Sequence, residues 1–171
     1  MKIIYEEVLK EFNKQKIKYI IVGGLAVNLL GYLRSTQDLD VLVEMTEDNL
    51  KKIVKILVRL GFSVKQPVNP MKVADYKVRK DWIENKNMKA FNFYKHDLFP
   101  QEVDIIIETP VDYNEAKRTV EHIKIDKLML PVISIKNLIK MKNAAKRNVD
   151  TLDIINLKEI AKEVLEDLLR M

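Results

Sequence analysis

Apolar residues recur with a helical period in five segments of the chain. Side chains three and four positions apart share one face of a helix, so each segment predicts a helix with one buried face. These helices cover residues 3–15, 25–33, 47–60, a segment that begins after residue 134, and about 150–169. Thr46 is placed to cap the third helix, and Gly61 is placed to end it.

Shorter apolar runs between these helices predict strands. The runs cover residues 18–22, 38–44, 89–95 and 102–108. Residues 96–101 would join the last two as a hairpin, residues 63–87 show no clear period, and residues 111–130 fit a helix and a short strand. Helices interleaved with a mixed sheet predict an α+β or a two-layer α/β protein.

Length and composition fit one folded domain over residues 1–171. A hydrophobic fraction of 47% is ordinary for a globular protein and argues against disorder. We expect a core over about residues 15–110 and a C-terminal helical part over about residues 134–171. The longest uncharged run, residues 19–33, is shorter than the roughly 20 residues that cross a bilayer. We therefore expect no membrane span.

Several kinds of chemistry are excluded by what the chain lacks. It contains no cysteine, which excludes disulfides, thiolate metal sites and thiol catalysis. Its only histidines, His96 and His122, make a histidine-rich metal site implausible. A chain without cysteines and without a signal peptide is typical of the cytoplasm.

Glycines are sparse and unevenly placed. The chain has four, and three of them lie within the nine residues 23–31. Gly23 and Gly24 follow the first predicted strand and precede a helix, so their backbone N–H groups and the helix dipole could receive a closely approaching phosphate. The alternative is a tight strand-to-helix turn with no ligand.

Three carboxylates occur on predicted strands. Asp38 and Asp40 are two residues apart, so they project from the same face of a sheet. Two like charges this close raise each other's pKa unless a cation lies between them, and Mg²⁺ prefers carboxylate oxygens. Asp104 would join them only if its strand lies beside theirs, which the sequence leaves open. Together with the two glycines, these residues describe metal-dependent phosphoryl chemistry on a nucleoside triphosphate.

The pattern of Gly-Gly, Asp-x-Asp and a later single Asp resembles the nucleotidyltransferase superfamily that includes DNA polymerase β. Residues 23–44, GGLAVNLLGYLRSTQDLDVLVE, are more similar still to AbiEii-like and small uncharacterised nucleotidyltransferase-like proteins. An Arg-x-Thr-x-Asp-hydrophobic-Asp sequence recurs in those proteins. Its polar members are here Arg34, Thr36, Asp38 and Asp40.

The C-terminal part resembles the same proteins. Residues 133–157, ISIKNLIKMKNAAKRNVDTLDIINL, match their helical motif through Lys142, Arg147, Asp150 and Asp153. From the residues alone, Asp150 and Asp153 are more simply explained as caps or braces of the last helix. In all, the resemblance covers roughly residues 15–62 and 100–160.

The resemblance implies a nucleotidyltransferase fold and a role for each matching residue. Asp38 and Asp40 would bind two Mg²⁺ or Mn²⁺ ions, and Asp104 would complete one ion site and help to deprotonate an acceptor hydroxyl. Further residues would bind the nucleotide through its phosphates. They are Gly23, Gly24, Arg34, Thr36 and Lys142. Many relatives carry Ser where this chain has Gly24, so a hydroxyl contact to phosphate is missing at that position.

The resemblance also implies a function. The chain would transfer a nucleoside monophosphate from an NTP to RNA, including tRNA, to protein or to a small molecule. A toxin–antitoxin or phage-defence role, with a cognate toxin or antitoxin chain as partner, follows from the AbiEii resemblance alone. One alternative is an inactive, antitoxin-like regulatory protein with the same fold.

Another alternative is an RNA-binding domain that uses residues 72–95. This segment holds seven Lys and Arg against three Asp and Glu, which gives +4 of the chain's net +5. Its aromatic residues are Tyr76, Trp82, Phe91, Phe93 and Tyr94. Basic and aromatic side chains together suit single-stranded RNA. The alternation of Phe91 and Phe93 is, however, what a half-buried strand requires, and we favour that interpretation.

Overall fold

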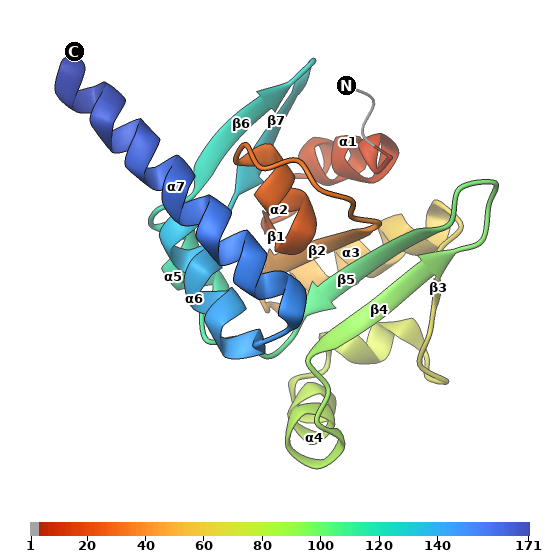
Figure 1. The fold of residues 1–171 in the computed structure, drawn as a ribbon. Coiled ribbons are helices and arrows are strands. Elements are labelled where there is room, and N and C mark those ends of the chain that lie inside the picture. Colours follow the sequence, from red (N-terminus) through yellow and green to blue (C-terminus); the bar gives the residue numbers. More distant parts are fainter. Residues whose placement is uncertain (1–3) are drawn as a thin grey trace.

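One mixed sheet forms the centre of the molecule in the computed structural model, which describes residues 4–171 (Figure 1). Its strands are β1 (Tyr19–Val22), β2 (Asp38–Val43), β3 (Ser63–Val64), β4 (Ala90–Lys95), β5 (Gln101–Ile106), β6 (Glu121–Ile125) and β7 (Leu128–Val132). They lie in the order β3-β4-β5-β2-β1-β7-β6. The pairs β2–β5 and β1–β7 are parallel, and the other neighbours are antiparallel. The predicted mixed sheet is confirmed.

Helices lie on both faces of this sheet. They are α1 (Glu6–Lys14), α2 (Gly23–Leu29), α3 (Glu47–Arg59), α4 (Tyr76–Lys86), α5 (Tyr113–Lys117), α6 (Ile135–Ala145) and α7 (Asn148–Arg170), with a 3₁₀ helix η1 (Pro70–Ala74). In Figure 1, α6 and α7 lie in front of the sheet and α3 lies behind it. All five predicted helices are present. The first was predicted to start at residue 3, which lies outside the described residues.

The alternation of side chains divides the sheet into an apolar and a polar face. Leu39, Val41, Val103 and Ile105 are fully buried among the core residues. The residues between them on β2 and β5 are acidic or only partly buried, and they point to the opposite face. The same strands thus build the core with one face and leave the other face for polar side chains.

Three regions differ from the sequence-based prediction or go beyond it. Residues 63–87 contain β3, η1 and α4, although only Arg79 and Trp82 of α4 are buried, so its periodic signal was weak. Asp75 caps α4 by accepting from the backbone N–H groups of Lys77 and Val78. Residues 111–130 contain α5 and the strand β6, and the strand β7 begins there, whereas one strand was predicted.

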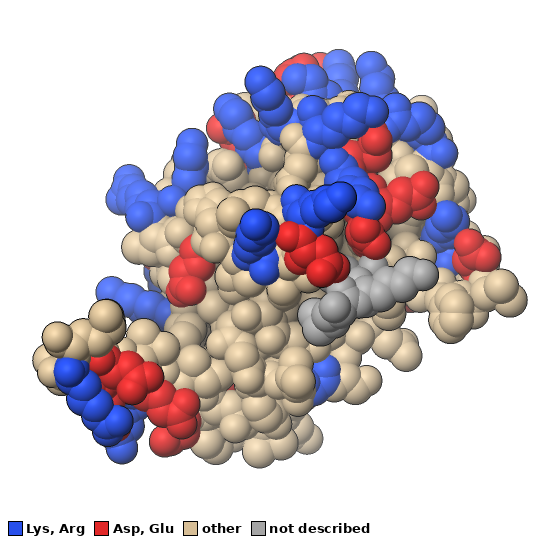
Figure 2. All heavy atoms as spheres, turned by 90° about the horizontal axis from the view of Figure 1, so that it is seen from above, with Lys and Arg blue, Asp and Glu red and all other residues tan. Residues whose placement is uncertain are grey.

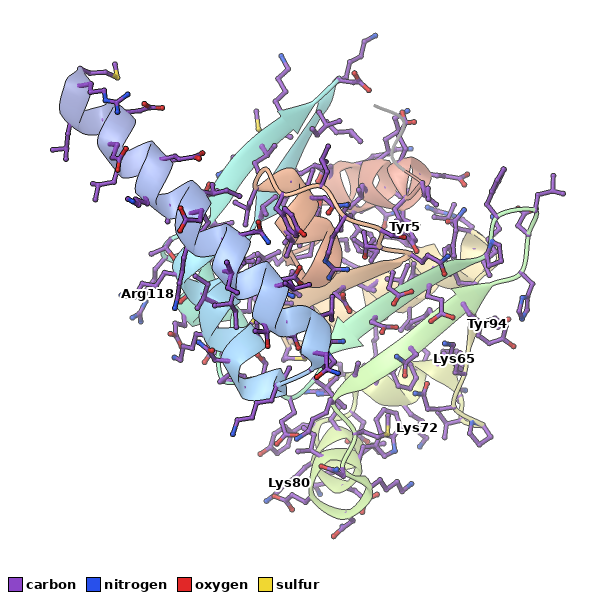
Figure 3. The ribbon with its side chains drawn as sticks, viewed as in Figure 1. Tyr5, Lys65, Lys72, Lys80, Tyr94 and Arg118 are labelled. Atoms are coloured by element: carbon purple, nitrogen blue, oxygen red, sulfur yellow. The ribbon has the colours of Figure 1, made fainter. Side chains whose placement is uncertain are left out.

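The aromatic residues of segment 72–95 are largely structural. Phe91 and Phe93 are fully buried, which confirms the strand interpretation. Trp82 stacks on Phe91 with ring centroids 5.0 Å apart. Lys72 and Lys80 lie on η1 and α4, away from α6 and α7 (Figure 3). Three of the five aromatic side chains are therefore unable to stack on an RNA base.

Charged side chains on the surface are mostly interspersed. Figure 2 shows Lys and Arg close to Asp and Glu in the upper part and at the lower left of the view, with a mostly uncharged area between them. On α1 and α3, for example, Lys10 pairs with Glu6 and Lys52 pairs with Asp48. Within residues 4–171 we find no helix with the length and apolarity that a bilayer crossing requires.

Candidate active site

Four carboxylates share the polar face of the sheet. In the parallel pair β2–β5, Asp40 lies opposite Asp104 and Asp38 lies opposite Glu102. Paired residues on neighbouring strands, about 4.8 Å apart, point to the same face. The sequence left open whether the strand of Asp104 lies beside the strand of Asp38 and Asp40. In the structure these two strands are adjacent.

Asp40 is the most perturbed of these acids. Burial raises its pKa to about 7, and the charges of Asp104 and Asp38 add to the effect. Burial also raises the pKa of Asp38 and of Asp104. Asn92 Nδ2 donates a hydrogen bond to Asp104 Oδ1 at 2.9 Å. This bond lowers the pKa of Asp104 and so opposes the effect of burial. The group holds more negative charge than its surroundings compensate.

Gly23 allows Asp40 to lie directly against the turn after β1. It has a positive φ of 66°, and a Cβ added there would lie 1.9 Å from Asp40 Oδ2. Glycine is therefore required here both by the backbone and by the neighbouring carboxylate. The two predicted motifs, Gly-Gly and Asp-x-Asp, are in contact in the folded chain.

Gly24 is crowded by two other residues that the sequence singled out. A Cβ at this position would lie 2.4 Å from Thr36 Oγ1 and 2.8 Å from Arg34 Nη2. The hydroxyl of Thr36 thus occupies the space into which a Ser side chain at position 24 would project. The position of the Thr36 side chain therefore explains why this chain has glycine rather than serine at position 24.

A chain of ion pairs joins this turn to the C-terminal helices. Arg34 Nε lies 2.9 Å from Asp153 Oδ1, and Asp153 Oδ2 lies 2.7 Å from Lys142 Nζ. Lys142 also contacts Asp150 Oδ1 at 3.1 Å, and Arg147 Nε lies 3.0 Å from Asp150 Oδ2. Lys142, Asp150 and Asp153 are buried. The two aspartates brace the corner between α6 and α7, in agreement with their simpler interpretation.

A cavity of about 720 Å³ opens between the sheet and α6. Four of the predicted site residues line it, namely Gly23, Asp40, Asp104 and Lys142. Arg147 lines it as well. The other predicted residues are not among those that line the cavity. They are Gly24, Arg34, Thr36 and Asp38.

Glu102 and Asn92 belong to this site and were missed by the sequence analysis. Glu102 Oε2 lies 2.6 Å from Lys65 Nζ, and Lys65 lies beside β4 and β5 in Figure 3. Each residue occupies a polar position of an alternating strand, Glu102 two before Asp104 and Asn92 between two phenylalanines. That alternation was the available signal, but only the pairing of β2, β4 and β5 shows that these residues meet.

Tyr5 ties the start of α1 to the same two strands. Its hydroxyl accepts from the backbone N–H of Glu102 at 3.1 Å and donates to the backbone carbonyl of Gln37 (Figure 3). Burial raises the pKa of Tyr5 to about 12, and nearby carboxylates contribute to the shift. The tyrosine therefore stays protonated and holds β2 and β5 together at the residues that precede the aspartates.

The donor atoms suit a divalent cation that binds together with a substrate. Among residues 4–171, no three or more His, Cys, Asp or Glu side chains are gathered as a complete metal site. Mg²⁺ is usually held by one or two carboxylates, with phosphate and water oxygens completing its shell. Asp40 and Asp104 offer such a pair, and burial together with the charges of Asp104 and Asp38 raises the pKa of Asp40.

The family model described as "Nucleotidyltransferase of unknown function (DUF6036)" matches residues 1–171. The chain belongs to this family of nucleotidyltransferases. No curated protein matches the chain.

Solved structures of nucleotidyltransferases share the fold of this DUF6036 member. The lincosamide antibiotic adenylyltransferase LnuA, solved with lincomycin bound, is 16% identical, with a TM-score of 0.59 over 90% of this chain and 93% of that chain. ANT(2")-Ia, in complex with adenylyl-2"-tobramycin, is 14% identical, with a TM-score of 0.56 over 98% and 95%. An antigenic nucleotidyltransferase-like protein from Paracoccidioides brasiliensis is 16% identical, with a TM-score of 0.54 over 88% and 71%. These similarities confirm the predicted nucleotidyltransferase fold.

Proposed function

We propose that this protein is a metal-dependent enzyme that transfers a nucleoside monophosphate from an NTP to a hydroxyl group. The observation that carries the proposal is the pairing of Asp40 with Asp104 beside the Gly23 turn, at a cavity of about 720 Å³. In the reaction, the acceptor oxygen forms a bond to the α-phosphorus. The bond from that phosphorus to the bridging oxygen breaks, and pyrophosphate leaves with the electron pair.

The carboxylates have distinct roles in this proposal. Asp40 and Asp104 would hold Mg²⁺ or Mn²⁺ together with the phosphates, and Asp38 would join them from the same face of β2. The bound ion would neutralise charge on the phosphates. Asp104 also accepts the proton of the attacking hydroxyl. Asn92 orients Asp104 through the hydrogen bond to Oδ1.

The remaining predicted residues bind or position the triphosphate. Gly23 and Gly24 begin α2, where backbone N–H groups have no partners within the helix. Arg34 and Thr36 pack against Gly24 and fix the shape of that turn. Lys142 has three donor hydrogens, of which Asp150 and Asp153 take two, so one is left for a phosphate in the cavity.

The acceptor is proposed from the neighbours in fold. Two of the similar structures have small antibiotics in their descriptions, lincomycin and an adenylylated tobramycin. They favour a small-molecule acceptor here, and RNA and protein are the other acceptors to screen. An AbiEii-like role with a toxin or antitoxin partner rests on the sequence resemblance alone.

Label transfer from an NTP tests this function. The purified protein is incubated with Mg²⁺ or Mn²⁺ and each α-labelled NTP in turn. Total cellular RNA, a cell extract and a panel of hydroxylated antibiotics serve as acceptors. We expect label to move to one acceptor class and the transfer to be lost in Asp38→Ala/Asp40→Ala. Transfer that persists in this double variant would exclude the proposed site.

A further inference from the structure

We propose that the end of the cavity remote from Asp40 binds a purine base, and that Glu108 and Lys89 recognise the polar edge of that base. This inference rests on the proposed function, because it takes the ligand to be an NTP. It adds the position of the base and the residues that select it. Neither residue was singled out by the sequence analysis.

The cavity lining extends from Asp104 on β5, which pairs with Asp40, to Glu108, four residues further along the chain, and its two ends differ in chemistry. The charged end carries the carboxylates of Asp40 and Asp104 together with Lys142 and Arg147. Apolar side chains line most of the remainder. They are Ile106, Pro110, Leu138, Met141, Ala144 and Ala145. A nucleoside triphosphate has the same division, with a highly charged triphosphate at one end and a flat, weakly polar base at the other.

Lys89 and Glu108 lie together at the end of the cavity remote from Asp40. Lys89 directly precedes β4, and Glu108 lies two residues after β5. The backbone N–H groups of Ile107 and Glu108 donate to the carbonyl of Lys89 at 2.9 and 3.2 Å, which fixes the two residues beside each other. Their side chains form an ion pair and both line the cavity. A donor side chain and an acceptor side chain therefore lie side by side at its rim.

This pair complements the edge of a purine. The carboxylate of Glu108 can accept a hydrogen bond from the exocyclic amino group of adenine or guanine. Each of these bases carries an acceptor atom next to that amino group, which the ammonium of Lys89 can reach. A purine also covers more of the apolar wall around Met141 than a pyrimidine does. Cytosine carries the same amino group beside an acceptor and differs from a purine only in its smaller apolar contact, whereas uracil has no amino group and fits the pair least well.

The test compares binding of nucleotides that differ by one group. ATP, GTP, CTP, UTP, ITP and inorganic tripolyphosphate are titrated in Mg²⁺ against the wild type, Glu108→Ala and Glu115→Ala. ITP is a purine nucleotide without the exocyclic amino group. Glu115 is the matched control, because its pair with Lys140 has side chains 41% and 51% exposed, against 40% and 62% for Glu108 and Lys89. Glu115 does not line the cavity.

We expect the wild type to bind the tighter of ATP and GTP at least about tenfold better than ITP, the effect of one hydrogen bond to a charged group. Glu108→Ala should bring that ratio close to one and leave tripolyphosphate binding unchanged, whereas Glu115→Ala should keep the ratio. Pyrimidine nucleotides that bind as tightly as purines, or a ratio that survives in Glu108→Ala, would overturn the base assignment alone. If neither tripolyphosphate nor any NTP binds, the proposed function itself fails.

Discussion

Asp40 lies where the turn after β1, the neighbouring Asp104 and the cavity meet. Its carboxylate fills the space that a side chain at position 23 would need, and burial raises its pKa to about 7. An unfolded aspartate has a pKa near 3.9. Without a bound cation, Asp40 therefore binds a proton more readily in the folded protein than in the unfolded chain, and this site has a pH-dependent effect on stability.

Replacing Asp40 by Asn should stabilise the metal-free protein at neutral and alkaline pH. Because the folded-state pKa is the higher one, ionisation of Asp40 lowers the free energy of unfolding as the pH rises from about 4 to about 7. We expect Asp40→Asn to be more stable than the wild type by about 1–3 kcal/mol at pH 8, with the difference shrinking toward pH 5. Urea unfolding in EDTA at several pH values measures it.

The control for this prediction is Asp97→Asn, at an exposed position of the loop between β4 and β5. This variant should follow the wild-type pH dependence. An Asp40→Asn protein that is less stable than the wild type at pH 8 without metal would show that Asp40 has a stabilising partner. The inference that burial and the neighbouring carboxylates disfavour the ionised form of Asp40 would then be wrong.

At the scale of single residues, spacing along the chain predicted the features that depend on neighbouring positions. Asp38 and Asp40 share a face because they are two apart on a strand, and the glycines lie at the strand-to-helix turn as expected. Two other features depend on pairing between strands. They are the contact between Gly23 and Asp40 and the position of Glu102 opposite Asp38. Side-chain type alone carries no information about such pairing.

At the level of elements, the corner between α6 and α7 connects the site to the rest of the fold. Lys142 on α6 is only 3% exposed and lies between Asp150 and Asp153 of α7. Arg34, in the loop before β2, reaches the same Asp153. Buried charges of this kind are stable only when paired, so the corner depends on each member of the set.

Lys142→Met should therefore destabilise the protein strongly. Removal of the ammonium leaves two buried carboxylates with fewer partners, and we expect a loss of about 2–4 kcal/mol in the free energy of unfolding. Lys140→Met is the matched control on the same helix, because Lys140 pairs with Glu115 at an exposed position and should contribute less than about 1 kcal/mol. Chemical denaturation compares the two, and equal losses would contradict the structural role of the buried pair.

Strongly periodic elements were predictable from sequence, and weakly patterned ones were not. The amphipathic helix α3 begins after Thr46 and ends before Gly61 as expected. Helix α4 buries only two residues, and β3 is two residues long, so neither produces a period. The burial of Lys142 was also outside the reach of sequence, because a lysine on a helix is usually solvated.

In the whole molecule, the site lies between two parts of the chain that are far apart in sequence. The sheet supplies the carboxylates from β2 and β5, and the segment from α6 to Arg147 supplies the cations. Figure 1 shows α6 and the start of α7 against the front of the sheet, while the second half of α7 projects away from it. The order of strands and the position of these helices brought the sequence motifs together.

The central claim is that Asp40 and Asp104 form one site for a metal-bound nucleotide. Electron paramagnetic resonance of Mn²⁺, titrated in the presence of a non-hydrolysable NTP analogue, tests it without knowledge of the acceptor. We predict that the wild type binds Mn²⁺ with the nucleotide and that Asp40→Asn/Asp104→Asn binds it at least about tenfold more weakly, since carboxylates are the ligands that such ions prefer. Undiminished binding of Mn²⁺ and nucleotide by the double variant would contradict the claim.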